Sequence, residues 1–127
     1  MCIRDRSNTL HLRKKLLMQL SDFLYNKISN IQINKIWQKQ NLNHILQYTT
    51  SWLQDMLYLK ITTQLNEKYI KNIDLIDTLQ VLMTHFKKQY LLILLDISLK
   101  TQANLKTNIN NQLAIEKLLL LWYKYYT

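Results

Sequence analysis

The 127-residue chain contains no glycine and no proline, and this absence constrains its fold more than any other feature. Tight hairpins, phosphate-cradling loops and dinucleotide-binding turns need glycine, because its backbone adopts positive φ angles and allows close approach without steric cost. Leu, Ile, Lys, Gln and Asn dominate instead, and apolar residues recur mostly at intervals of three and four. We therefore predict an all-α fold, a compact bundle of five to six helices, without a glycine-rich nucleotide site.

Three features of the sequence indicate the class of protein: its length, its single cysteine and its short apolar runs. A chain of this length fits one domain, whose folding buries about two thirds of its surface. Cys2 is the only cysteine, so no intrachain disulfide forms, which fits a reducing compartment. The longest apolar runs, residues 90–95 and 118–123, are far shorter than the about 20 residues that span a bilayer. We expect a soluble cytoplasmic protein that does not bind membranes.

Residues 1–6 differ in character from everything that follows. The sequence Met-Cys-Ile-Arg-Asp-Arg has neither an apolar signal core nor an amphipathic targeting pattern. It resembles the translated adapter found at the start of some assembled reading frames, in which case the native protein begins further upstream. The alternative is a short frayed terminus. We expect a non-native or disordered leader at residues 1–6 and a single helical domain at 7–127.

The first half of the chain predicts three helices. Ser7 or Asn8 can cap the first, whose apolar stripe extends to residue 28. A solvated face is expected for its basic residues Arg13, Lys14, Lys15 and Lys27. Asn30 is expected to cap a short helix at residues 31–39, with Trp37 as a core anchor. Asn41 is expected to cap the longest helix, residues 42–65, whose two apolar faces are separated by Gln47, Gln54 and Asp55.

The second half predicts three more helices after a polar loop at residues 66–72. Asp74 and Asp77 stand in the first turn of a strongly periodic helix that reaches Phe86, where they complement the helix dipole. The next helix, residues 89–106, should be buried in its first half and exposed in its second. The last helix follows the Asn cluster at 108–111, and its apolar stripe is so wide that other helices or a partner chain should cover most of it. The aromatics after it close the bundle or contact a partner.

Residues for catalysis are hard to find. His11, His44 and His85 lie on different predicted helices, and none forms the i, i+4 pair of zinc hydrolases. Asp74 and Asp77 are explained by capping and dipole interactions rather than by general acid and base chemistry. We therefore predict no catalytic, cofactor-binding or metal-binding residues, no small-molecule ligand and no enzymatic activity in this chain alone.

The formal net charge of +9 raises the possibility of a nucleic-acid partner. Residues 1–40 carry eight Lys or Arg against two acids, whereas 41–127 carry nine Lys against six acids, so the excess lies mainly at the front. The bias toward Lys, Asn, Ile and Tyr is also what an AT-rich coding sequence produces. A basic helical nucleic-acid-binding domain is therefore our alternative hypothesis, with phosphate contacts from Lys14, Lys15, Lys87 and Lys88.

Three sequence motifs, in their order and spacing, resemble the C-terminal domain of the delta-prime subunit of bacterial DNA polymerase III, a subunit of the sliding-clamp loader. The segment at 52–60, Trp-Leu-Gln-Asp-Met-Leu-Tyr-Leu-Lys, is similar to that family's "W-L-x-D-L-L-x-L-K/R" helix. Asn72-Ile73-Asp74 follows, and the segment at 108–120 is similar to the ending "N-x-N/P-x-L-x-x-E-x-L-L-L". The likeness covers nearly everything after residue 7, although Asn110-Asn111 stands where many relatives have Pro.

This resemblance implies a collar-like helical domain, the C-terminal fragment of a longer subunit. Its implied partners are the gamma/tau and delta subunits, with DNA reached only indirectly through the complex. The ATPase-type modules of that family lie N-terminal to the collar, and none is encoded here. Our leading hypothesis is therefore a non-catalytic oligomerisation domain in DNA replication. The candidate residues for the subunit interface or core are Trp52, Asn108, Leu113, Leu119, Trp122 and Tyr123.

Overall fold

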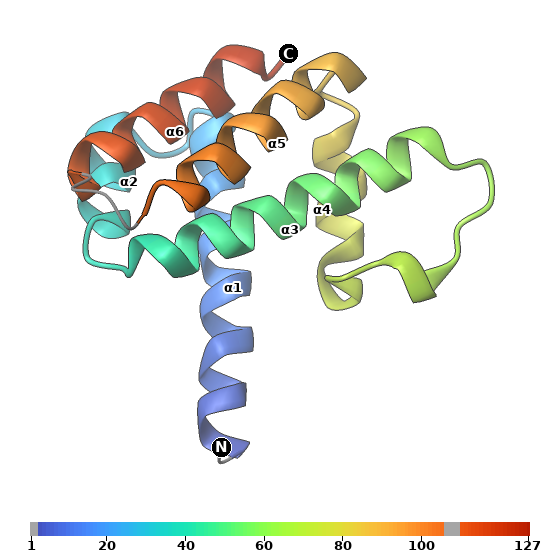
Figure 1. Cartoon of the computed structure of the whole chain (residues 1–127), viewed down its shortest axis with the longest axis horizontal. Coiled ribbons are helices and arrows are strands. Elements are labelled where there is room, and N and C mark those ends of the chain that lie inside the picture. Colours follow the sequence, from blue (N-terminus) through green and yellow to red (C-terminus); the bar gives the residue numbers. More distant parts are fainter. Residues whose placement is uncertain (1–2, 106–109) are drawn as a thin grey trace.

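The computed structural model describes residues 3–105 and 110–127, and side chains from residue 11 onward within these ranges. All regular structure in the described part is helical, which confirms the predicted all-α class (Figure 1). The elements are α1 (Ile3–Leu24), α2 (Asn30–Trp37), α3 (Leu42–Ile61), η1 (Glu67–Tyr69), η2 (Ile73–Leu75), α4 (Ile76–Met83), α5 (Lys88–Ala103) and α6 (Asn111–Tyr125), where η marks a 3-10 helix.

The helices form a compact bundle around α3. The most extensive contact is between α3 and α5, and α3 also packs against α4. On the other side, α6 contacts both α5 and α2. Figure 1 shows α1 running at a steep angle to α3, with its N-terminal half extending beyond the other helices. Among the described helices, none combines the length and the apolar character needed to span a membrane.

Polar side chains define where the helices begin. The Asn41 side chain accepts hydrogen bonds from the backbone N–H groups of Asn43, at 2.8 Å, and His44, at 3.4 Å, which confirms the predicted cap of α3. In α2 the cap is Ser29 rather than the expected Asn30. Ser29 and Gln32 each accept a hydrogen bond from the other's backbone N–H, and this capping box satisfies two donors at once.

The end of α1 shows how the chain turns without glycine. Asn26 has a φ of 64°, the only positive value in the described residues. The N–H of Lys27 donates to the carbonyl of Asp22 at 2.7 Å, and the N–H of Asn26 donates to Phe23 at 3.0 Å. This is the hydrogen-bond pattern of a Schellman motif, in which asparagine replaces the usual glycine. The helix therefore ends at Leu24, earlier than the predicted residue 28.

Two further predicted boundaries in the first half of the chain are wrong, and so is the prediction of the longest helix. Helix α1 begins at Ile3, so Ser7 and Asn8 lie within it rather than at its cap. No proline or glycine interrupts residues 3–8, and extending an existing helix costs far less than starting one. Helix α3 ends at Ile61 because Thr62 turns into an extended conformation. With 20 residues, α3 is shorter than α1, which has 22 and is the longest helix described.

The second half also departs from prediction in places. A 3-10 turn, Ile73–Leu75, precedes α4, and α4 ends at Met83 before the buried Phe86. Helix α5 ends at Ala103 rather than 106. Its first half is not buried all round, because Leu92 and Ile93 are exposed while Leu91 and Leu94 face the core.

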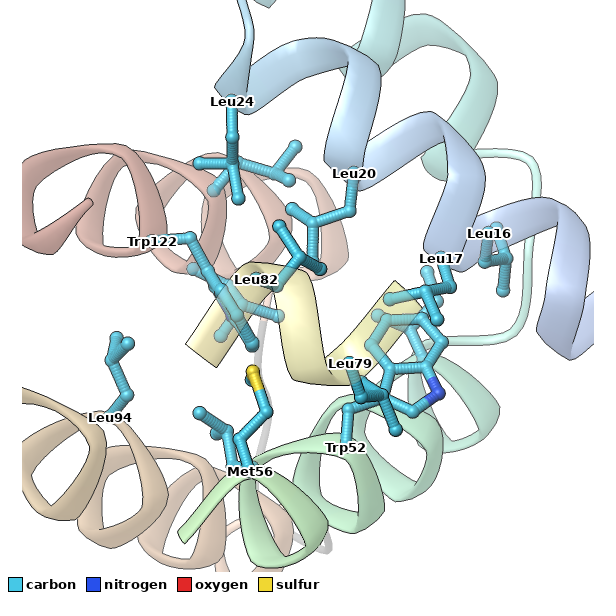
Figure 2. Close-up of a cluster of buried hydrophobic side chains, with 14 of the residues drawn as sticks. Leu16, Leu17, Leu20, Leu24, Trp52, Met56, Leu79, Leu82, Leu94 and Trp122 are labelled. Atoms are coloured by element: carbon cyan, nitrogen blue, oxygen red, sulfur yellow. The ribbon is translucent and has the colours of Figure 1, made fainter. Parts of the chain in front are cut away.

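One continuous core joins all six described α-helices. Figure 2 shows Trp122 of α6 reaching toward Met56 of α3 and Leu82 of α4, while Trp52 lies beside Leu79. The predicted anchor Trp37 is fully buried. Burial of this many apolar side chains makes a large favourable contribution to the stability of the domain.

Candidate functional surface

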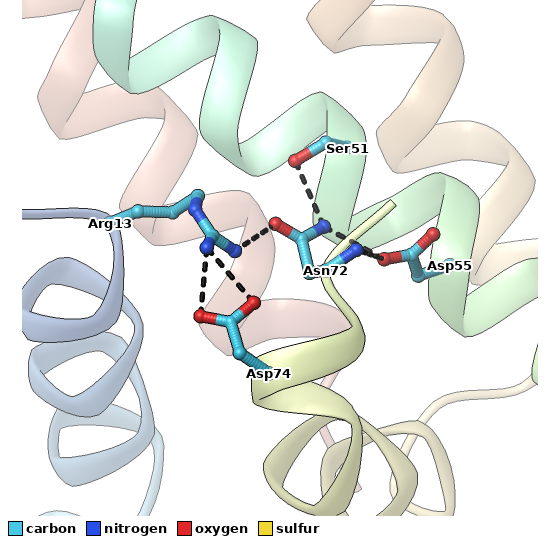
Figure 3. Close-up of polar contacts among 5 residues, drawn as sticks. All are labelled: Arg13, Ser51, Asp55, Asn72 and Asp74. Carbon is cyan, nitrogen blue, oxygen red and sulfur yellow. Dashed lines mark hydrogen bonds and ion pairs between the residues drawn. The ribbon is translucent and has the colours of Figure 1, made fainter. Parts of the chain in front are cut away.

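A polar network whose residues Arg13, Asp55 and Asn72 are buried connects α1, α3 and the segment before α4 (Figure 3). It consists of Arg13, Ser51, Asp55, Asn72 and Asp74. The Arg13 guanidinium donates to the side-chain oxygen of Asn72 and to both oxygens of Asp74, at 2.9 and 2.8 Å. Asn72 donates to the Ser51 hydroxyl at 3.2 Å and to the Asp55 carboxylate at 2.7 Å.

Asp55 is the acceptor at the centre of this network. Its side chain is only 1% exposed, yet its two oxygens also accept the backbone N–H groups of Lys71 and Asn72, at 2.9 and 2.8 Å. A buried carboxylate is tolerated when such hydrogen bonds replace its lost hydration. The network therefore fixes the turn at residues 71–74 onto α3 and α1.

The network corrects two sequence interpretations. Arg13 was expected on a solvated face, but it is only 8% exposed, because Asn72 and Asp74 supply the acceptors that allow a guanidinium to be buried. Asp74 was attributed to the helix dipole, yet its carboxylate forms an ion pair with Arg13 at 2.8 Å. These contacts span about sixty positions of sequence, so local pattern alone could not reveal them.

The titratable groups offer no reactive constellation in the described residues. His11 and His44 are exposed and His85 is half-buried. No group of three or more His, Cys, Asp or Glu in this part of the chain is arranged to hold a metal ion. Burial, and to a lesser extent the nearby Tyr25, raises the pKa of the Tyr126 phenol. A tyrosine that stays protonated at neutral pH is a packing group rather than a base.

The six candidate interface or core residues fall into three groups. Trp52, Leu119 and Trp122 are fully buried in the core. Leu113 and Tyr123 are exposed on α6, and the Tyr123 hydroxyl donates to the side chain of Asn26 at 2.7 Å. The sixth candidate, at position 108, lies outside the described residues.

The outward side of α6 carries exposed apolar side chains. Leu113 is 62% exposed and Leu120 is 56% exposed, and the two lie seven residues apart, on the same side of the helix. Beside them on α2, Ile31 is 71% exposed. We call the set Ile31, Lys35, Leu113, Lys117, Leu120 and Tyr123 the outer face of α6. The described part of the chain therefore does not provide the predicted covering of α6 on this side.

Grooves run along both sides of α6. The groove toward α5 is lined mainly by apolar side chains, including Ile97, Leu113, Leu118 and Leu121, with Lys117 at its edge. The groove toward α2 has two connected parts that share Asn30 and Leu120. Its lining is richer in amides, and it carries Lys27 and Lys35.

Charge on these grooves is mostly basic. Lys27, Lys35 and Lys117 line them, against the single acid Glu116, which accepts from the Gln112 side chain at 3.2 Å. None of the three lysines has a carboxylate within salt-bridge distance in the described part of the chain. The outer face of α6 thus combines exposed leucines with unpaired positive charge.

Aromatic side chains close the opposite end of the bundle from the α3 cap. Tyr126 stacks on His85 with ring centroids 4.7 Å apart and meets Phe86 edge-on at 5.7 Å. The Thr127 N–H donates to the carbonyl of His85 at 2.8 Å. Tyr90 of α5 contacts Tyr125 of α6 at 4.8 Å. These contacts join the segment after α4, the start of α5 and the end of α6.

Sequence reasoning missed Arg13, Asn72 and Ile31 as notable residues. Arg13 carried one available signal: it is the only arginine after residue 6, and arginine suits buried ion pairs better than lysine does. Asn72 was noted only as part of a motif. Ile31 had no distinguishing signal, because its exposure depends on how α2 packs against α6.

Residues 7–124, nearly the whole chain, match the model of one protein family, described as DNA polymerase III, delta subunit, C terminal. No curated protein and no solved structure gives a significant match. The matched region contains all of the polar network and the outer face of α6. The matching family is that of the delta subunit, whereas the sequence motifs suggested delta-prime.

Proposed function

We propose, because this chain belongs to the family of C-terminal domains of the DNA polymerase III delta subunit, that it is an assembly domain of the clamp loader in bacterial DNA replication. More specifically, we propose that it is the collar domain of a delta-prime subunit in the cytoplasm. Residues 7–127 would form this domain, and residues 1–6 a non-native leader. The partners would be the collars of the gamma/tau and delta subunits, and DNA would be reached only through the complex.

The observation that carries this proposal is the outer face of α6. A helix that supplies four fully or nearly fully buried residues to the core also leaves Leu113 and Leu120 more than half exposed. Exposed apolar side chains gathered on one face mark a surface that a protein partner covers.

The delta-prime assignment rests on the motifs at 52–60, 72–74 and 108–120. Two of these motifs supply three members of the polar network, Asp55, Asn72 and Asp74. This gives the likeness a physical basis, because the motif residues hold one another in place. The competition experiment that follows distinguishes delta-prime from delta.

The test uses the whole chain with gamma/tau, delta and delta-prime subunits purified from the same genome. We expect the chain to co-elute with gamma/tau and with delta on size exclusion. In competition, it should displace delta-prime from a reconstituted complex and leave delta bound. Displacement of delta would reassign the chain to the delta position, and failure to bind any subunit would refute the proposal.

One observation favours the alternative function. Lys87 lies over the Tyr90 ring at 5.7 Å and Lys124 over Tyr125 at 5.5 Å, so two lysines flank a tyrosine pair. Such an arrangement can contact phosphates and stack on bases. This alternative predicts DNA binding without a protein partner at physiological salt, weakening steeply as salt rises. A salt titration with a labelled single-stranded oligonucleotide tests it.

A further inference from the structure

We propose that the outer face of α6 receives an acidic amphipathic helix from the equivalent domain of a neighbouring subunit. This inference rests on the proposed assembly function and specifies the chemistry of the partner. The argument starts from the shape of the surface. Leu113 and Leu120 form a ridge whose two leucines are two turns, or about 10 Å, apart along α6.

The two grooves beside this ridge, one toward α5 and one toward α2, can receive side chains from a partner helix. The α5-side groove is lined by Ile97 and Leu121, and the α2-side groove by Ile31 and Leu120. A helix that crosses the ridge can place apolar residues at i, i+3, i+4 and i+7 into such grooves. The apolar surface therefore selects an amphipathic helix rather than an extended peptide, because no unpaired strand edge exists in the described part of the chain.

The lysines on the outer face of α6 indicate which charge the partner helix carries beside its apolar stripe. Lys35 lies on the α2 side of the ridge and Lys117 on the α5 side, and both are exposed and unpaired in the described residues. A partner helix with Asp or Glu flanking its apolar stripe would pair with both lysines. A basic partner would be repelled, so the same lysines also reject wrong neighbours.

A nucleic acid fits this surface less well than a protein helix. Phosphates would pair with the lysines, but the exposed Leu113, Leu120 and Ile31 between them would remain in contact with water. The lysine–tyrosine contacts that could suit a nucleic acid lie elsewhere, at Tyr90 and Tyr125. The outer face of α6 and that end of the bundle are therefore separable by mutation.

The experiment measures binding of the whole chain to purified gamma/tau and delta subunits by biolayer interferometry. The test variants are Leu120→Ser and the double charge reversal K35E/K117E. Their matched controls are Val81→Ser, an exposed apolar residue on α4, and K14E/K15E, two exposed lysines on α1. We expect each test variant to bind about tenfold more weakly or worse, and each control to bind within about twofold of the original chain. Unchanged circular dichroism shows that the variants are folded.

The outcomes separate this inference from the proposed function. If the unmodified chain binds but both test variants bind equally well, the outer face of α6 is not the interface and only this inference fails. If Leu120→Ser weakens binding and K35E/K117E does not, the proposal that the partner helix is acidic is wrong. If K35E/K117E weakens binding to a labelled single-stranded oligonucleotide but not to the subunits, the surface contacts nucleic acid and the inference is overturned. If the unmodified chain binds no subunit, the proposed function itself fails.

Discussion

The polar network and the outer face of α6 differ in whether their side chains have interaction partners within the described chain. In the network, the buried charges and amides of Arg13, Asp55 and Asn72 find hydrogen-bond partners within the chain. On the outer face of α6, apolar side chains and lysines are left without partners in the described residues. The first region therefore stabilises the fold, whereas the second is, as we propose, a surface that a partner subunit covers. Substitutions should distinguish the two regions. Those in the polar network should change the free energy of unfolding, whereas those on the outer face of α6 should change only assembly.

The largest effect is expected from Leu119→Asp. Leu119 is fully buried, and an unpaired carboxylate there should cost more than about 4 kcal/mol, a large fraction of a small domain's stability. The matched control is Leu120→Asp, one residue along the same helix but exposed, which should keep the cooperative unfolding transition. Thermal melts by circular dichroism measure both. If the two variants melted alike, the inner and outer sides of α6 would not differ as described.

Asp55→Ala should have the next largest effect. It leaves the backbone N–H groups of Lys71 and Asn72 and the Asn72 amide without their acceptor, at a cost of about 3 kcal/mol. Asp96→Ala is the control, because Asp96 forms only an exposed pair with Lys100 and should change stability by less than about 0.5 kcal/mol. Urea unfolding gives the two free energies. Equal small values would mean that the network does not stabilise the fold.

A third substitution, Leu113→Ser, should leave the free energy of unfolding within about 0.5 kcal/mol of the original. The side chain is already mostly in water, so folding gains little from it. The solubility of the Leu113→Ser variant should instead improve, because serine replaces a large exposed apolar side chain. Urea unfolding and light scattering against concentration measure the two effects. A clear loss of stability would contradict the assignment of Leu113 to an assembly surface.

The smallest effect concerns alkaline pH. Because burial raises the pKa of Tyr126 above the usual value of about 10, folding favours the protonated phenol. This contribution is fully present below the unfolded pKa and is lost as pH rises through the higher folded pKa. The Tyr126→Phe variant should therefore lose less stability than the original chain as the pH rises from about 9 to above 10. Melting temperatures across that range test the sign, and identical slopes would contradict it.

Local patterns in the sequence predicted much of the fold. The Asn41 cap, the buried Trp37 and the core stripe of α6 depend on residues within one or two turns, so periodicity and capping chemistry suffice to find them. The end of α1 was missed because the apolar stripe continues to Ile28, so the periodicity carried the predicted helix past the stop signal at Asn26.

The site was less predictable, because it depends on contacts between distant segments. The burial of Arg13 requires Asn72 and Asp74 to arrive from about sixty residues away. Similarly, exposure of Ile31 and Leu120 depends on how α2 and α6 pack, whereas the sequence shows only that both are apolar. Sequence reasoning identified Leu113 and Tyr123 as candidates, but it could not separate them from the buried Trp52, Leu119 and Trp122.

The turn at Asn26 has a consequence for how rigidly the outer face of α6 is held. A glycine there would satisfy the backbone equally well but would carry no side chain to receive the Tyr123 hydroxyl. Asn26 thus has two roles: its backbone ends α1, and its side chain holds the C-terminal part of α6 to the end of α1. Because asparagine stands here in place of glycine, the end of α1 has a side-chain hydrogen bond to α6 that a glycine at this position could not form.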